Sequence, residues 1–205
     1  MFGLSAKELS ILKRLSTPVK IQDFLDTLAI NFEPNGDTLM SPRAVIHTKR
    51  AHCIEAALLA ATALLVHRKK PLLMDLRSLA HDFDHVITLY KHGKYWGAIS
   101  KSNHTALRFR DPIYRTPREL ALSYFHEYFL NTNGQKTLRE YSRPFSLSRY
   151  GKDWITSEDD LWKIAEDLDD AKHFPLIPRG VERMLRPADA FERKIGVAVE
   201  WKKKP

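Results

Sequence analysis

Apolar residues near the start of the chain recur at helical spacing, and the residues before them mark where helices begin. The segment 5–15 places leucines on one face, and Ser5 with Glu8 forms a capping-box pattern at its start. A second helix is predicted from Pro18, because proline suits the first position of a helix. The turn-forming residues 34–37 end this helical region.

The segment 54–66 is apolar almost all the way round, and Glu55 is its only charged residue. A helix without a polar face is one that other elements cover on every side, so we expect a buried helix here. It follows a polar, basic stretch at 41–50, and Cys53 lies where that stretch meets the helix. Its longest apolar run is too short to cross a membrane, so no membrane association is expected.

Strand-like segments follow the apolar helix. Residues 72–76 form a plausible strand, and 85–91 and 94–100 flank His92 and Gly93. Two β-type runs around such a dipeptide predict a β-hairpin. A loop is expected just before it, at 80–84.

The predicted turn also sets which residues face each other across the hairpin. If His92 and Gly93 form a two-residue turn, Lys91 faces Lys94 and His85 is paired with Ser100. Directly paired side chains lie close enough to hydrogen bond, so we expect Ser100 to contact the His85 imidazole.

The second half of the sequence is predicted to be mostly helical. A capping box at Thr116 to Glu119, with proline at the first position, starts a helix that runs to about Asn133. An acidic helix is expected over 157–170, and the proline-containing segment after it looks irregular.

This order of elements predicts an α+β fold, in which a buried helix packs on a small antiparallel sheet flanked by further helices. The length suits a single domain over residues 1–205. We expect its core at about 18–105 and a helical C-terminal extension at about 116–205.

Composition narrows the classes of function. The formal net charge is +8, but the basic residues are scattered and no nucleic-acid-binding motif accompanies them, so a nucleic-acid partner is not favoured. The single cysteine excludes an internal disulfide and suits a reducing compartment. The N-terminus lacks the features of a signal peptide, and we expect a cytoplasmic protein.

Cys53 is the first candidate for chemistry. At the start of a helix the backbone N–H groups and the helix dipole favour a thiolate, and the neighbouring Lys49 and Arg50 act in the same direction. The same N–H groups are able to hold an oxyanion. A buried cysteine is more often an inert apolar residue, so this interpretation needs a base nearby.

Among the central histidines, His85 is the best candidate for that base. It opens a strand, from which a side chain can lean toward a helix packed against the sheet. His92 lies in the predicted turn. His52 directly precedes Cys53 and is expected to point elsewhere.

A cysteine that opens a buried helix, followed by the pattern H-V-x-x-x-Y-x-x-G-x-Y-W from His85 onward, resembles the core of the transglutaminase-like superfamily of cysteine enzymes. The stretches DHVITLYKHGKYWGAISKSN, LRFRDPIYR and LREYSRP are similar to a bacterial branch of this superfamily. The resemblance implies that Cys53 is the nucleophile, that His85 is the base, and that Ser100 occupies the position that orients the histidine.

That position usually holds Asp in the superfamily, and serine orients an imidazole without adding charge. Asn103 is an alternative orienting group, while Asp82 and Asp84 come before the strand. The implied chemistry is acyl transfer at an amide or peptide bond through a Cys53 thioester, with hydrolysis favoured over crosslinking. This chemistry requires no cofactor and no metal.

Two other interpretations remain open. The residues His47, His81, Asp82 and Asp84 resemble the ligands of an HD-type metal phosphohydrolase, although that family places its His-Asp pair on a helix and a strand follows here. The other is a non-catalytic protein that keeps the fold in a binding or scaffolding role, for which the missing acid at Ser100 is the argument.

Overall fold

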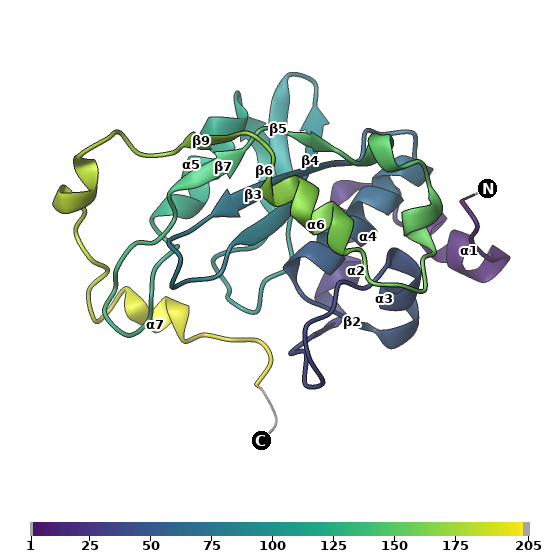
Figure 1. Cartoon of the computed structure of the whole chain (residues 1–205), viewed down its shortest axis with the longest axis horizontal. Coiled ribbons are helices and arrows are strands. Elements are labelled where there is room, and N and C mark those ends of the chain that lie inside the picture. The colour runs from purple at the N-terminus through teal and green to yellow at the C-terminus, as the bar shows by residue number, and fades with distance from the viewer. Residues whose placement is uncertain (1, 203–205) are drawn as a thin grey trace.

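The computed structural model, which describes residues 2–202, confirms a mixed α+β fold (Figure 1). Four helices come first in the chain and gather on one side of a sheet. Their bounds are α1 Ala6–Arg14, α2 Pro18–Asp26, α3 Pro42–Thr48 and α4 Cys53–Val66. The hydroxyls of Ser5, Thr17 and Ser41 cap the first three by accepting a backbone N–H bond within the first turn.

The third helix is one that the sequence analysis missed. Residues 41–50 were expected to be a polar stretch, yet α3 occupies most of it. Its start has a serine N-cap followed by a proline, the same kind of signal that predicts α2 and α5. The helix ends at Thr48, and the backbone of its C-cap residue Lys49 is left-handed with a φ of 58°.

The main sheet has seven strands, and every pairing in it is antiparallel. Along the sheet the order is β6, β5, β4, β3, β7, β9, and β8 also pairs with β3. The bounds are β3 Leu72–Arg77, β4 His85–His92, β5 Tyr95–Ile99, β6 Arg110–Tyr114, β7 Glu140–Ser142, β8 Phe145–Ser146 and β9 His173–Pro175. A separate parallel pair joins β1 Ala29–Ile30 to β2 Arg50–Ala51.

The prediction of a helical C-terminal extension needs correction. Three of its segments, β7, β8 and β9, are strands, and β7 and β8 pair directly with β3 of the predicted core. The two parts of the chain therefore share one sheet. These strands have only two or three residues each, which is too short for an alternating pattern to stand out in the sequence.

Two helices cover opposite faces of this sheet. On one face, Leu73 and Val86 pack in one cluster with the apolar residues of α4, and the Thr88 hydroxyl donates to the Ala57 carbonyl at 2.7 Å. On the other face, α5 (Pro117–Phe125) packs Leu120 and Tyr124 on the sheet. The predicted burial of the 54–66 helix is confirmed, since every residue from Ile54 to Leu64 is buried.

The hairpin forms as predicted, but its predicted register is wrong. The turn consists of Gly93 and Lys94, so His92 faces Tyr95 and Tyr90 faces Gly97. Gly93 has a φ of 58°, and glycine takes a positive φ at the first turn position without steric cost. The turn is therefore set by where glycine stands, and the strands shift by two residues relative to the prediction.

Two helix boundaries also differ from the predictions. The helix that starts at Pro117 ends at Phe125 rather than near Asn133, because Phe129 turns back to pair with Lys136. The acidic helix α6 spans Trp162–Asp169 and starts later than expected. The residues just before it contact another loop instead of continuing the helix, since the Asp160 carboxylate accepts the Leu39 N–H at 2.8 Å.

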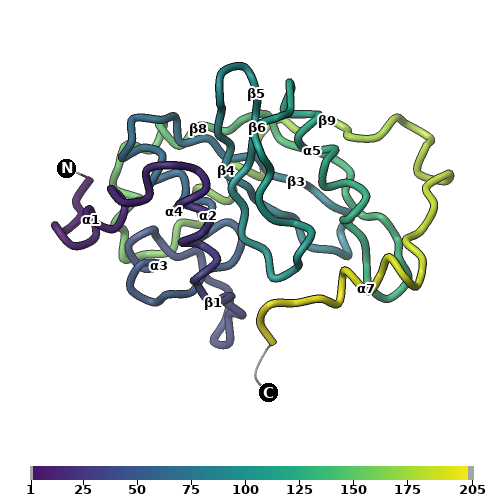
Figure 2. Tube along the Cα trace, turned by 180° about the vertical axis from the view of Figure 1, so that it is seen from behind, coloured from purple at the N-terminus to yellow at the C-terminus, as the bar shows by residue number. Residues whose placement is uncertain are grey.

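The last part of the chain is irregular, as predicted, apart from β9, a short 3₁₀ turn at Val181–Met184 and α7 (Arg193–Gly196). Figure 2 shows this segment returning beneath the loop that joins β5 to β6. No helix among residues 2–202 is long and apolar enough to cross a membrane.

Candidate functional site

Cys53 is the first residue of α4, and His52 is its N-cap. This confirms the expectation that Cys53 opens a buried helix packed on the hairpin. The cysteine is half-buried and forms part of the wall of a pocket of about 360 Å³, which His52 and His85 also line. The first backbone N–H groups of a helix lack partners within the helix, which makes them candidate donors to a substrate oxygen.

The second part of the site joins the start of β4 to the end of β5. His85 is buried, and its Nε2 lies 2.7 Å from the Ser100 hydroxyl oxygen. That hydroxyl donates its own hydrogen to the Leu107 carbonyl at 2.8 Å. A hydroxyl that donates elsewhere must accept from the imidazole, so Nε2 carries a proton and Nδ1 is the nitrogen left for proton exchange.

Ser100 is itself held in place by a residue from α2. The buried side chain of Gln22 donates from Nε2 to the Ser100 carbonyl at 2.9 Å and accepts the Ser100 N–H at 3.0 Å. Both backbone polar groups of Ser100 are therefore bonded to a single amide. This arrangement ties α2 to the end of β5 next to the His85 imidazole.

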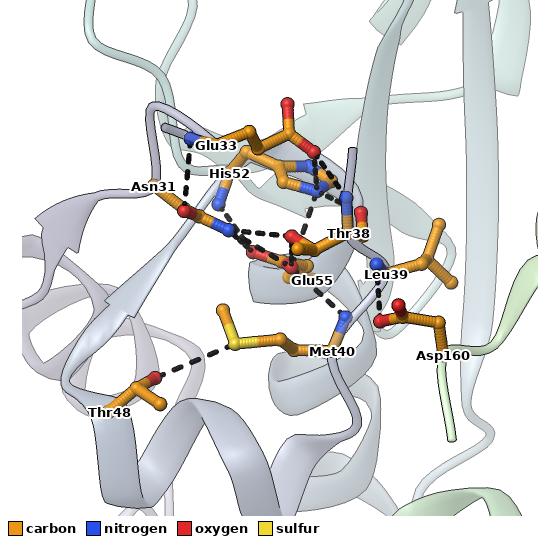
Figure 3. A network of polar contacts seen from close by, with 9 residues as sticks. All are labelled: Asn31, Glu33, Thr38, Leu39, Met40, Thr48, His52, Glu55 and Asp160. Carbon is orange, nitrogen blue, oxygen red and sulfur yellow. Dashed lines mark hydrogen bonds and ion pairs between the residues drawn. The ribbon is translucent and has the colours of Figure 1, made fainter. Parts of the chain in front are cut away.

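A buried carboxylate organises the start of α4 (Figure 3). Glu55 is completely buried and accepts hydrogen bonds from Asn31, Thr38 and the backbone N–H groups of Met40 and His52. Its Oε1 also lies 3.4 Å from the His52 Nε2. Burial alone raises the pKa of Glu55, but these partners, His52 first among them, outweigh burial and lower it.

His52 lies between this carboxylate and the cysteine. Its Nε2 is 2.9 Å from the Thr38 carbonyl, which can only accept, so the nitrogen donates. Burial lowers the pKa of His52, but the Cys53 sulfur and the Glu55 carboxylate outweigh burial and raise it well above its usual 6.5. The raised pKa favours the imidazolium form of His52, which Cys53 and Glu55 both stabilise.

The same environment acts on the thiol. Burial raises the pKa of Cys53, yet the side chains of His52 and His85 outweigh it and bring the pKa from 9.0 down to about 5. A thiol with this pKa is ionised throughout the neutral range. The cysteine is thus in a setting that favours a nucleophile, and two histidines contribute to it.

The pocket beside Cys53 is closed on one side by the C-terminal segment. Ile195 and Gly196 belong to its wall, and the Asn103 side chain bonds both the N–H and the C=O of Trp201, at 2.8 and 2.9 Å. His104 also bonds the Gly196 carbonyl through Nδ1 at 2.8 Å. We name residues 193–201 the C-terminal strap.

Hydrogen bonds distinguish among the residues that were predicted to orient His85. Ser100 is the one bonded to His85, whereas Asn103 uses its amide on the strap. Asp84 accepts from the Ser78 N–H at 2.7 Å, and Asp82 accepts from the Thr137 hydroxyl. Both aspartates line the pocket near Cys53.

The residues that resemble a metal phosphohydrolase do not come together. His47 pairs with Glu8 at 2.9 Å, and His81 lies in a turn, 3.3 Å from the Gln135 side chain. Within residues 2–202, the one group of at least three side chains placed to share a cation is Asp75, Asp84 and Asp169. Asp75 in that group is already bonded to His173 at 3.0 Å.

The expectation that His52 points elsewhere is wrong, because its side chain hydrogen bonds Cys53 and lies 3.4 Å from Glu55. Two other contributors to the site, Glu55 and Gln22, were not predicted. The order His-Cys-x-Glu at a helix start was a usable signal, because a Glu at the third helical position often bonds the N-cap N–H. Gln22 carried no signal, since it reaches Ser100 across a separation of 78 residues.

Neither the models of known protein families nor the curated proteins give a match to this sequence.

Proposed function

We propose that this protein is a transglutaminase-like cysteine enzyme that acts on amide or peptide bonds through a Cys53 thioester. The observation that carries the proposal is a thiol of lowered pKa at the start of α4, which lines one pocket with an imidazole whose Nε2 is bonded to Ser100. A nucleophile, a base and a group that orients the base are the parts that such chemistry needs.

In the first step the thiolate attacks the carbonyl carbon, and the electron pair of the C=O bond moves to oxygen. The N–H groups at the start of α4 are placed to stabilise this oxyanion. His85, which holds the proton of the ionised Cys53 thiol on Nδ1, then gives this proton to the leaving nitrogen as the C–N bond breaks, and a thioester remains. Water, from which His85 takes a proton, cleaves the thioester and restores the thiolate; an amine in place of water would give transfer.

The two histidines have different roles in this proposal. The raised pKa of His52 keeps it protonated, so it supports the thiolate by charge and does not shuttle protons. His85 is the residue that exchanges a proton. Ser100 fixes the tautomer of His85 by accepting a hydrogen bond from Nε2. It therefore orients the imidazole as an aspartate would, but it supplies no negative charge.

Alkylation across pH tests the state of the thiol. Because the pKa of Cys53 is lowered to about 5, its reaction with iodoacetamide should rise to a plateau by about pH 6, whereas a free thiol gains rate through pH 8. A thiolate of low pKa is a weaker nucleophile, so the advantage over glutathione should be about tenfold at pH 6 and small at pH 8. Mass spectrometry reads the single cysteine.

Turnover tests whether the thiol is part of an enzyme. With p-nitrophenyl acetate, the wild-type protein should form an acetyl thioester at Cys53 and hydrolyse it. His85→Ala should accumulate the acetylated protein, because the base for hydrolysis is lost, with a loss of about 10²-fold or more in its hydrolysis. His81→Ala is the matched control, since that histidine is exposed and contacts Gln135. A wild-type thioester as long-lived as that of His85→Ala would contradict the enzyme and favour the non-catalytic role.

A further inference from the structure

A second pocket lies away from Cys53. It has a volume of about 600 Å³ and is bounded by the start of α2, the end of α4 and the β4–β5 hairpin. Leu64 and His67 near the end of α4 line it, whereas Cys53 is the first residue of that helix. At 1.5 Å per residue, α4 separates the two pockets by roughly 20 Å.

The walls of this pocket are apolar over most of their length. Apolar residues in and beside α2, α4 and the hairpin line it, among them Leu15, Val19, Ile21, Leu64 and Tyr90. The Tyr90 ring packs over Gly97, where a Cβ atom would come within 2.5 Å of it. Its volume lies within the range of roughly 300–1,000 Å³ that small-molecule pockets occupy.

The rim has a strong charge bias. Lys69, Lys70 and Lys91 line it together with His67 and His92, and Asp111 is the only carboxylate residue among its lining residues. None of the three lysines has a carboxylate within ion-pair distance in the part of the chain that the structure describes. The Lys91 ammonium instead lies over the Trp96 ring, 4.1 Å from its centre.

We propose that this pocket, named here the α2–hairpin pocket, binds a small soluble anion with an apolar body, such as a medium-chain fatty acid. Its apolar walls take up the chain, and the lysines on its rim pair with the carboxylate. Apolar walls favour the chain of such a molecule, and the neighbouring cations favour its carboxylate over a cationic head group.

Binding of sodium dodecanoate, below the concentration at which it forms micelles, tests this proposal. Calorimetry with the full chain should give saturable binding of dodecanoate. Dodecyltrimethylammonium, with the same chain and the opposite charge, and acetate, with the carboxylate alone, should both bind at least tenfold more weakly. Quenching or shift of tryptophan fluorescence should accompany binding, because Trp96 lines the pocket.

Charge reversal separates the rim from the protein's overall charge. The pair Lys69→Glu and Lys70→Glu should weaken dodecanoate binding about tenfold. The matched pair Lys7→Glu and Lys13→Glu changes the net charge equally at exposed positions outside the pocket and should have little effect. Val19→Trp, at a half-exposed wall position, should block the chain without touching the lysines.

The proposal is overturned if dodecanoate and dodecyltrimethylammonium bind alike, or if both charge-reversed pairs lose affinity equally. It is also overturned if vesicles of phosphatidylglycerol bind the protein while dodecanoate does not, which would make this face a membrane contact. A urea unfolding curve for each variant shows whether it is folded. If the charge-reversed pair does not fold, Val19→Trp provides a second test that leaves the charge unchanged. Acetylation and turnover at Cys53 are independent of these outcomes.

Discussion

At the scale of single residues, the candidate site depends on a few side chains that fix the backbone around the reacting groups. Ser100 is the clearest case, because its hydroxyl, N–H and carbonyl are all engaged, by Leu107, His85 and Gln22. Because the Ser100 hydroxyl donates its hydrogen to Leu107, it can only accept a hydrogen bond from the His85 imidazole. Gln22 is thus a positioning residue, which acts on His85 through Ser100.

Gln22→Ala tests that role. It leaves the N–H and the carbonyl of buried Ser100 without partners, which should lower the free energy of unfolding by about 1–3 kcal/mol. At a temperature where the variant is folded, hydrolysis of the acetyl thioester should slow about tenfold and its pH profile should shift, because His85 is no longer held in one tautomer.

Two further variants show whether the effect is one of position. Gln22→Glu still accepts the Ser100 N–H but cannot donate to the carbonyl, so its rate should fall between those of Gln22→Ala and the wild type. Gln135→Ala removes an amide that contacts His81 outside the site and should leave the profile unchanged. A variant Gln22→Ala with lower stability but a normal pH profile would make Gln22 a purely structural residue.

At the scale of elements, the β4–β5 hairpin shows why a wrong register still brought the right residues together. In the observed register, Thr88 faces Ile99, so His85 and Ser100 are diagonal rather than direct neighbours. A shift of two residues keeps every side chain on its face, since successive residues alternate. Diagonal neighbours remain within reach of long side chains, and the imidazole reaches Ser100 at 2.7 Å.

The hairpin also depends on Gly97, which faces Tyr90. Gly97→Ala would put a Cβ atom within 2.5 Å of the Tyr90 ring, so we expect a loss of about 1–3 kcal/mol in the free energy of unfolding, measured in urea. Adding Tyr90→Leu should recover part of that loss, because the clash is with the ring. Gly36→Ala is the comparison for backbone strain alone, since nothing lies within 4 Å of a Cβ atom added at Gly36. The steric explanation is contradicted if both glycine variants lose the same free energy of unfolding and Tyr90→Leu recovers none of it.

At the scale of the whole molecule, the end of the described chain closes the pocket beside Cys53. The C-terminal strap is held by Asn103, His104 and Asn131, and the last of these donates to the Gly196 carbonyl at 2.8 Å. Its side chains Ile195 and Val197 are largely exposed, so few apolar contacts hold it down. A segment attached mainly by polar contacts opens at low free-energy cost.

Asn103→Ala should release the strap, because two hydrogen bonds to Trp201 of about 1 kcal/mol each are lost. We expect proteolysis within 193–202, and labelling of Cys53 by a bulky maleimide, to accelerate about tenfold. The midpoint of the iodoacetamide pH profile should stay near 5, since Asn103 does not contact His85. Asn35→Ala, at an exposed loop position, is the control. A raised midpoint in Asn103→Ala would instead assign this residue to the orientation of His85.

The sequence by itself determined those features that depend on local patterns. Helix starts at Ser5, Pro18 and Pro117 follow from capping residues and proline, and burial of α4 follows from its lack of a polar face. Cys53 at that helix start was predictable for the same reason. Alternation along 85–99 was enough to place His85 and Ser100 on one face of a hairpin.

Only the tertiary structure decided what depends on contacts between distant segments. The early end of α5 and the short strands β7 to β9 are set by packing and pairing partners that no local pattern identifies. The same holds for Gln22 on Ser100 and for Asn103 on the strap. A side-chain hydrogen bond between remote residues requires only that the fold bring two polar groups together, and sequence spacing carries no record of it.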